Sequence, residues 1–138
     1  MKKNYILDAC ALIAAIKQEE GSLIIAELYE EAAKGDANLI MNKVNLLEVY
    51  YGFRRDHGKE YADIILKSVI DSVVEISDIS IAVLVEAGRI KSAYRRISLA
   101  DSIALAETVS CGGYLVTADH HEMDILDKAG VVNFLWIR

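Results

Sequence analysis

Four acidic residues spread along the chain have the side-chain chemistry of a divalent-metal site: Asp8, Glu48, Asp101 and Asp119. Carboxylate oxygens are ligands that Mg²⁺ and Mn²⁺ prefer, whereas zinc favours nitrogen or sulfur. Such ions lower the pKa of a bound water and neutralise charge on a departing phosphate oxygen, so no serine or cysteine nucleophile is required. The acids therefore predict one or two Mg²⁺ or Mn²⁺ ions and phosphate chemistry.

Three of these acids have a purely structural alternative as helix caps. Asp8 follows a short apolar run and precedes a helical pattern, where an aspartate can accept hydrogen bonds from the first backbone amides of the helix. Asp119 and Glu122 have the spacing of a capping box, as do Ser98 and Asp101. Taken one at a time, these three acids leave capping and metal binding both open.

Glu48 lies in the middle of a predicted helix, where a cap cannot explain it. It shares an i, i+3, i+4, i+7 stripe with Val44, Leu47 and Tyr51, which predicts that this face points inward. A carboxylate on an inward face is rarely buried unless a cation pairs with it. Asp101 shares its side of a helix with buried-type residues and is also expected to face inward.

The elements that must position these acids alternate between strand and helix. Strands are predicted at 5–7, 39–41, 73–76, 114–117 and 131–136, and helices directly after Asp8 and at about 23–34, 43–57, 59–72, 77–96, 98–111 and 118–128. This alternation predicts an α/β fold, a central parallel sheet of about five strands with helices on both faces. With no linker or repeat, residues 1–138 are expected to form one domain.

The predicted sheet brings the acids together. Ligands of open parallel sheets bind beyond the carboxyl ends of the strands, where Asp8 and Asp119 both lie. Glu48 and Asp101 come from helices that can close over the same edge. Four converging carboxylates would repel one another without a cation. We therefore expect one shared, metal-binding pocket.

At these acids the chain resembles the PIN domain family, and more narrowly the VapC-type toxins of prokaryotic toxin–antitoxin pairs. The matching segments are 5–13, 45–52, 98–106 and 114–119, in the order of the family. The resemblance implies a metal-dependent endoribonuclease that hydrolyses RNA phosphodiester bonds, a homodimer, and a small antitoxin as partner. It places Asp8, Glu48 and Asp101 at the core acidic positions and Asp119 at the fourth, more variable one.

One departure from the family and three rival interpretations bear on this assignment. Family members often carry Ser, Thr or Asn just after the first aspartate, where this chain has Ala9 and Cys10. Haloacid-dehalogenase-type enzymes would need a second aspartate at Cys10, and response-regulator receivers would need paired N-terminal acids and a late lysine. A catalytically idle PIN-fold module that binds RNA or protein remains the alternative function.

Composition restricts the cellular compartment in which the protein is expected. The chain has 54% hydrophobic residues, 26% charged residues and a net charge of −6, of which four metal-bound carboxylates would account for most. No apolar run is long enough for a membrane span or a signal peptide, so a cytoplasmic protein with reduced, buried Cys10 and Cys111 is expected.

Two groups of polar residues near the acids remain open. Arg95 and Arg96 precede Asp101 and are candidates for binding RNA phosphates, with a solvated helix face as the alternative. His120 and His121 are either substrate contacts or a solvated turn, and the turn is the favoured interpretation.

Overall fold

Five parallel strands form one sheet in the computed structural model, which describes residues 2–138. The strands are β1 (Lys3–Leu7), β2 (Ala37–Asn42), β3 (Glu75–Ser77), β4 (Tyr114–Thr117) and β5 (Asn133–Trp136). Their order is β3-β2-β1-β4-β5, and every neighbouring pair is parallel. The predicted α/β class and parallel sheet are confirmed.

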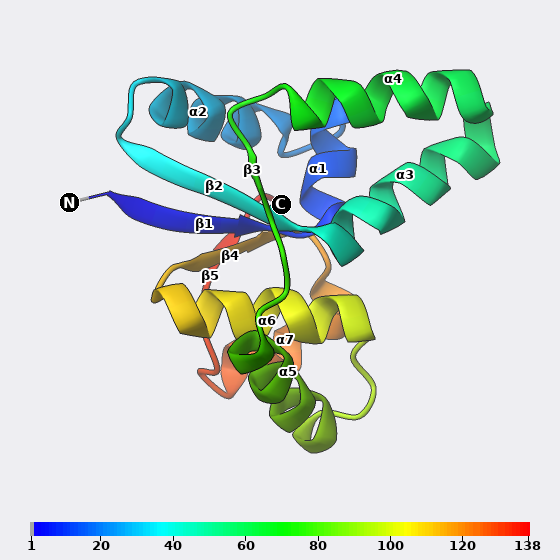
Figure 1. The fold of residues 1–138 in the computed structure, drawn as a ribbon. Coiled ribbons are helices and arrows are strands. Elements are labelled where there is room, and N and C mark those ends of the chain that lie inside the picture. The colour runs from blue at the N-terminus through cyan, green and yellow to red at the C-terminus, as the bar shows by residue number, and fades with distance from the viewer. Residues whose placement is uncertain (1) are drawn as a thin grey trace.

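Helices cover both faces of the sheet, as expected. They are α1 (Ala9–Ile16), α2 (Ser22–Ala33), α3 (Lys43–His57), α4 (Lys59–Ile70), α5 (Ile81–Ala93), α6 (Leu99–Cys111) and α7 (His120–Lys128). Helices α1 to α4 lie on one face and α5 to α7 on the other (Figure 1). Within residues 2–138, no helix combines the length and apolar character needed to cross a membrane.

Alternate residues of β1 contribute to two hydrophobic cores, one on each face of the sheet. Ile6 packs in the core beneath α5, α6 and α7 together with its neighbour in β4, Leu115. Leu7 points the other way and packs with its β4 neighbour Val116 under α1 to α4. This two-residue period is the expected one for a strand covered on both faces. Packing on both sides holds the central strands β1 and β4, which carry the site.

The chain reverses its direction of travel across the sheet between β1 and β4. From β1 it moves outward to β2 and β3, and then returns to add β4 and β5 on the other side. Strands β1 and β4 are therefore neighbours whose following connections leave to opposite sides. A crevice opens beyond the carboxyl ends of such strands, which is where open α/β sheets bind ligands.

The segment around α5 differs from its prediction. The third strand is Glu75–Ser77 rather than 73–76, and the next helix spans Ile81–Ala93 rather than 77–96. The helix begins later because Ser80 caps it, with Ser80 Oγ accepting a hydrogen bond from the Val83 amide at 3.1 Å. Arg95 and Arg96 consequently lie in a turn between α5 and α6 and not on a helix face.

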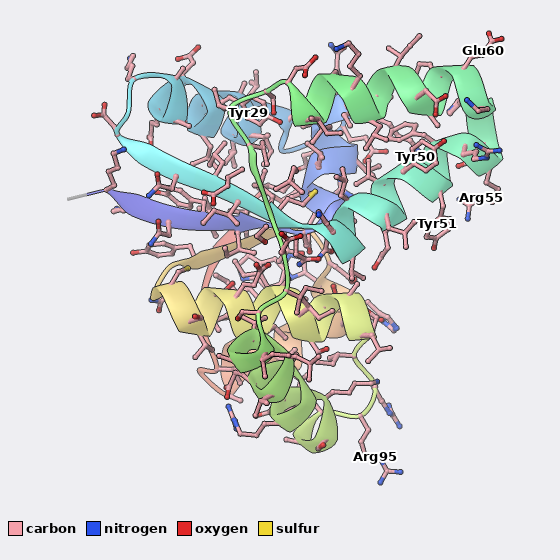
Figure 2. The ribbon with its side chains drawn as sticks, viewed as in Figure 1. Tyr29, Tyr50, Tyr51, Arg55, Glu60 and Arg95 are labelled. Atoms are coloured by element: carbon pink, nitrogen blue, oxygen red, sulfur yellow. The ribbon has the colours of Figure 1, made fainter. Side chains whose placement is uncertain are left out.

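The predicted inward stripe of α3 was wrong. Leu47 and Tyr51 are 57% and 51% exposed, and Figure 2 shows Tyr51 extending outward from the helix. The buried face carries Leu46, Val49 and Phe53 instead. Apolar residues occur on two sides of this helix, so a pattern of period 3.6 fits two orientations, and packing against α1 and α4 selects the second.

Candidate metal centre

Asp8 connects the end of β1 to the start of α1. Its Oδ1 accepts a hydrogen bond from the Ala11 amide at 2.8 Å, so Asp8 caps α1 as its structural interpretation predicted. Its side chain is also buried in the crevice, and the residue is only 1% exposed. Burial, followed by the charges of Asp119 and Glu48, raises the pKa of Asp8 to about 7, against the effect of hydrogen bonds from Thr117 and Ala11.

Asp119 occupies the equivalent position after β4. Its Oδ1 accepts a hydrogen bond from the Glu122 amide at 3.2 Å, so it caps α7. Its own amide donates to Thr117 Oγ1 at 3.0 Å. These two bonds fix the turn that follows β4 and hold the Asp119 carboxyl at the crevice.

Asp101 enters the crevice from the first turn of α6. Its amide donates to the capping Oγ of Ser98 at 3.1 Å. The residue is 8% exposed, and the inward orientation predicted for it is confirmed by the burial of Leu105 and Thr108 beside it. Burial, then the neighbouring carboxyl of Glu122 and the charge of Asp8, raise the pKa of Asp101 to about 9.

Two glutamates complete the cluster, one expected and one missed. Glu48 reaches the crevice from α3, where it is half-buried at the edge of the packed face, and burial followed by the charge of Glu122 raises its pKa. Glu122 was interpreted only as the capping-box partner of Asp119. One carboxylate oxygen each from Asp101, Asp119 and Glu122 lie within 4.8 Å of one another. The sequence did offer a signal for Glu122, because it stands three residues after Asp119 and residues at this spacing lie on the same side of a helix.

One cavity of about 180 Å³ is lined by all five carboxylates. Its remaining walls come from Ala9, Cys10, Asn45 and Ser98. The structure thus brings the four predicted acids together and adds Glu122. Capping and convergence are compatible, because Asp8 and Asp119 each cap with one oxygen and keep a second.

The donor set fits a hard divalent cation. Five carboxylates share a small cavity in which Asp8 and Asp101 are buried and the other three are half-buried, and a cation is what makes such crowding favourable. Among residues 2–138, the only sulfur on the cavity wall is the Cys10 thiol, whose pKa is raised to about 11 by burial and by Asp8. The thiol therefore stays protonated and is a poor metal ligand at neutral pH. Cys10 and Cys111 are both free and half-buried, not buried as expected.

Asn45 joins the helices that carry the acids. Its Oδ1 accepts a hydrogen bond from the Ala9 amide at 3.2 Å, and its Nδ2 donates to the Ala100 carbonyl at 3.3 Å. The backbone amide of Asn45 donates to Asn42 Oδ1 at 2.8 Å, and Asn42 thereby caps α3. Asn45 therefore fixes the residues next to Asp8 and Asp101, and sequence analysis gave it no role.

The other predicted polar residues lie outside the metal cavity. His120 is exposed, as predicted, but it begins α7 and does not lie in a free turn. Its ring stacks on Trp136 with centroids 3.9 Å apart, and its nitrogens bind Asp124 Oδ1 and the Arg138 carbonyl, both at 2.8 Å. His121 is exposed, as predicted. Arg95 and Arg96 are exposed in the turn before α6 and line a second cavity.

Comparison with known protein families identifies the fold. A family model described as the PIN domain matches residues 5–129. The chain belongs to the PIN domain family. PIN domains are generally nucleases, which gives the acidic cavity a reaction class. The comparison with curated proteins finds no significant match.

Solved structures share this PIN fold over nearly the whole chain. DNA-bound VapBC from Salmonella typhimurium superposes with a TM-score of 0.76 at 16% identity, covering 100% of both chains. VapBC2 from Rickettsia felis, bound to a promoter DNA fragment, gives 0.75 at 18% identity over 96% of this chain and 97% of that one. VapBC-5 from Mycobacterium tuberculosis gives a TM-score of 0.67 at 18% identity, over 97% of this chain and 98% of that one. All three are toxin–antitoxin proteins of the VapBC family, and at these identities the likeness establishes the fold.

Proposed function

We propose that this PIN domain is a metal-dependent endoribonuclease that hydrolyses RNA phosphodiester bonds. Asp8, Glu48, Asp101 and Asp119 would hold one or two Mg²⁺ or Mn²⁺ ions, and Glu122 is a further candidate ligand. The observation that carries the proposal is the single cavity in which these five carboxylates meet. A module that only binds RNA or protein has no use for this costly concentration of buried and half-buried acids.

The residues around the cavity suit a negatively charged substrate once a cation is present. When bound, the ions supply charge neutralisation on the phosphate and a lowered pKa for attacking water. Helices α1, α6 and α7 all begin at the cavity, so their N-terminal partial positive charges favour anions there. The carboxyls of Asp8 and Asp101, whose pKa values are raised, must release protons when a cation binds.

RNA is the substrate that the resemblance to VapC-type toxins favours, and the same resemblance supports a toxin role in the cytoplasm. The VapBC structures that share the fold of this chain are toxin–antitoxin proteins, which supports a small antitoxin as its partner. Co-expression with the product of the adjacent gene tests this: the antitoxin should co-purify with the chain and suppress cleavage.

A homodimer is the assembly that we propose. Leu47 and Tyr51 lie one turn apart on α3 and are both more than half exposed, which leaves an apolar face for a second copy. Light scattering coupled to gel filtration should give a dimer for the wild type and a monomer for Leu47→Glu. A monomeric wild type would contradict the proposal.

The central experiment is a cleavage assay on labelled RNA. Wild-type protein with Mn²⁺ should cut, EDTA should abolish cutting, and Asp8→Asn and Asp101→Asn should be inactive while remaining folded by circular dichroism. Equal cutting by wild type and both variants would assign the activity to a contaminant. Tight RNA binding without any cleavage would favour the idle module. A DNA oligonucleotide of the same sequence tests the choice of RNA.

A further inference from the structure

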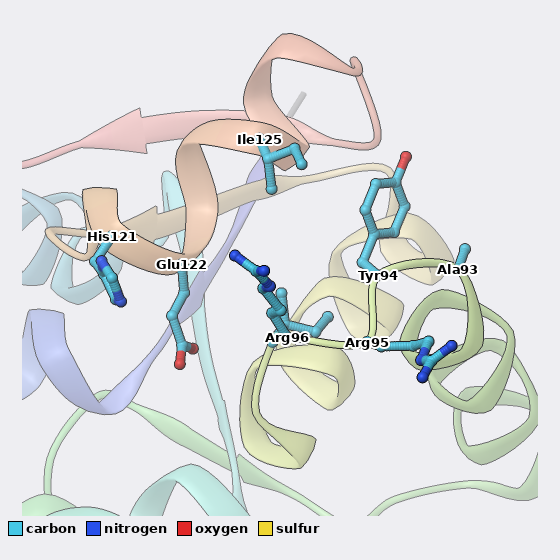
Figure 3. Close-up of a pocket in the computed structure, with 8 residues that line it drawn as sticks. Ala93, Tyr94, Arg95, Arg96, His121, Glu122 and Ile125 are labelled. Carbon is cyan, nitrogen blue, oxygen red and sulfur yellow. The ribbon is translucent and has the colours of Figure 1, made fainter.

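A second cavity, of about 380 Å³, lies between α7 and the turn that joins α5 to α6 (Figure 3). Its volume falls in the range of small-ligand sites, which begins at roughly 300 Å³. Glu122 lines this cavity as well as the metal cavity, so the two are neighbours with a shared wall. The second cavity therefore lies directly beside any phosphate held at the acids.

The turn that forms one side of the cavity is held by Lys91. Its Nζ donates a hydrogen bond to the Arg95 carbonyl at 2.7 Å and another to the Ile97 carbonyl. Ser98 then caps the next helix, which fixes the far end of the turn. A side chain carried by a turn whose backbone is already fixed loses less freedom when a ligand binds.

Arg96 is the cation that faces into the cavity. Figure 3 shows its side chain between Glu122 and Tyr94, whereas Arg95 is directed away from them. In the part of the chain that the structure describes, neither arginine forms an ion pair. Arg55 and Arg89, in contrast, each pair with a neighbouring carboxylate. Arg96 therefore has its guanidinium available for a phosphate, the anion that its planar fork binds best.

The rest of the wall suits a base. Tyr94 is half-buried beside Arg96, and Ile125 on the facing helix is 61% exposed although it is apolar. Aromatic rings provide stacking platforms for single-stranded bases, and a neighbouring cation tracks the backbone. A cation, an aromatic ring and an exposed aliphatic side chain around one cavity match a nucleotide better than a purely acidic peptide.

We propose that this cavity binds the nucleotide next to the cleaved phosphodiester of single-stranded RNA, with Arg96 on its phosphate and Tyr94 and Ile125 against its base. The inference rests on the proposed function. Phosphate binding is thereby assigned to Arg96 and not to Arg95. Because Glu122 forms the shared wall, a cation bound at the acids also removes the charge that would repel this phosphate.

Steady-state cleavage of a labelled RNA oligonucleotide with Mn²⁺ tests the assignment. Arg96→Ala should lower kcat/KM about tenfold, mainly through KM, and should reduce the slope of log KM against log salt by about 0.7. Arg96→Lys should recover part of the loss. Arg95→Ala should have a clearly smaller effect. The rise in melting temperature that Mn²⁺ causes should be the same in Arg96→Ala as in wild type, because the metal ligands are intact.

A second variant blocks the cavity without changing the core, and a matched variant far from the cavity is its control. Ile125→Glu places a negative charge at the mouth and should also raise KM, whereas Ile64→Glu on α4, equally exposed at 66%, should not. Equal behaviour of Arg96→Ala and Arg95→Ala, or of the two glutamate variants, would overturn the inference while leaving the nuclease intact. So would loss of antitoxin binding with normal cleavage. A wild type that cuts no RNA would overturn both proposals.

Discussion

Asn45 donates a hydrogen bond from its side-chain amide to the carbonyl of Ala100, a residue 55 positions away and directly before Asp101. The same side chain accepts from Ala9, directly after Asp8. Both contacts are buried, so a single amide sets the separation between two helices that carry acids of the candidate metal centre. Sites of this kind depend on the groups that orient the ligands as well as on the ligands themselves.

Asn45→Ala should weaken the metal centre without removing a carboxylate. It leaves the buried Ala9 amide without its partner and removes the second bond to the Ala100 carbonyl, which costs about 1–3 kcal/mol of unfolding free energy. Looser positioning should reduce Mn²⁺ affinity about 10- to 100-fold by calorimetry. Asn38→Ala, which removes a bond to Asn4 at the opposite end of the sheet, is the control and should leave Mn²⁺ affinity unchanged. Similar affinities for all three proteins would contradict the role of Asn45.

Two substitutions at Asp8 separate its capping role from its charge. Asp8→Asn keeps an oxygen for the Ala11 amide and removes one of the crowded negative charges, so without metal it should unfold at the same temperature as wild type or higher. Asp8→Ala should lose about 1 kcal/mol because the cap disappears. Neither variant should gain stability from Mn²⁺. A large destabilisation in Asp8→Asn would mean that the residue is mainly structural.

Glu122→Gln tests the residue that sequence analysis missed. If Glu122 is a ligand, the variant should bind Mn²⁺ about tenfold more weakly and show a smaller metal-induced rise in melting temperature. Asp124→Asn, on the same helix, keeps its hydrogen bond to His120 and is the matched control. Equal metal affinities for these two variants would remove Glu122 from the centre.

Glu107 makes stability depend on pH independently of the metal centre. The residue is 8% exposed on α6, Ser77 Oγ donates to its carboxyl at 2.5 Å, and burial raises its pKa. A raised pKa means that the folded chain holds this proton more tightly than the unfolded chain. The resulting stabilisation is complete at pH values below 4.5, the ordinary pKa of a glutamate. It is lost as the pH rises through the raised pKa of Glu107 in the folded chain.

Glu107→Gln should therefore be more stable than wild type at pH 7.5, and the two should converge near pH 4. Urea unfolding across this range, with EDTA present, measures the difference. Glu60→Gln, at an exposed position on α4, should follow the wild type at every pH. A constant difference between Glu107→Gln and wild type would show that packing is responsible and not ionisation.

Local signals predicted most of the fold and four of the five clustered acids. Strand ends followed by aspartates, Ser98 before α6, and the alternation of elements are all features of short segments. Glu122 was missed because a capping box already explained it locally. The face of α3 was wrong because apolar residues occur on two sides of it. Asn45 could not be found this way, since its contacts span 36 and 55 residues.

The caps at Asp8 and Asp119 tie two candidate metal ligands to helix stability, and this limits how the sequence can diverge. If the proposed reaction were no longer needed in a descendant, selection on it would vanish, but α1 and α7 would still require an acceptor at their first turn. We expect such chains to carry Asn or Ser at these two positions more often than Ala. Glu48 caps nothing and should drift freely, so its loss would be the earlier mark of an abandoned activity.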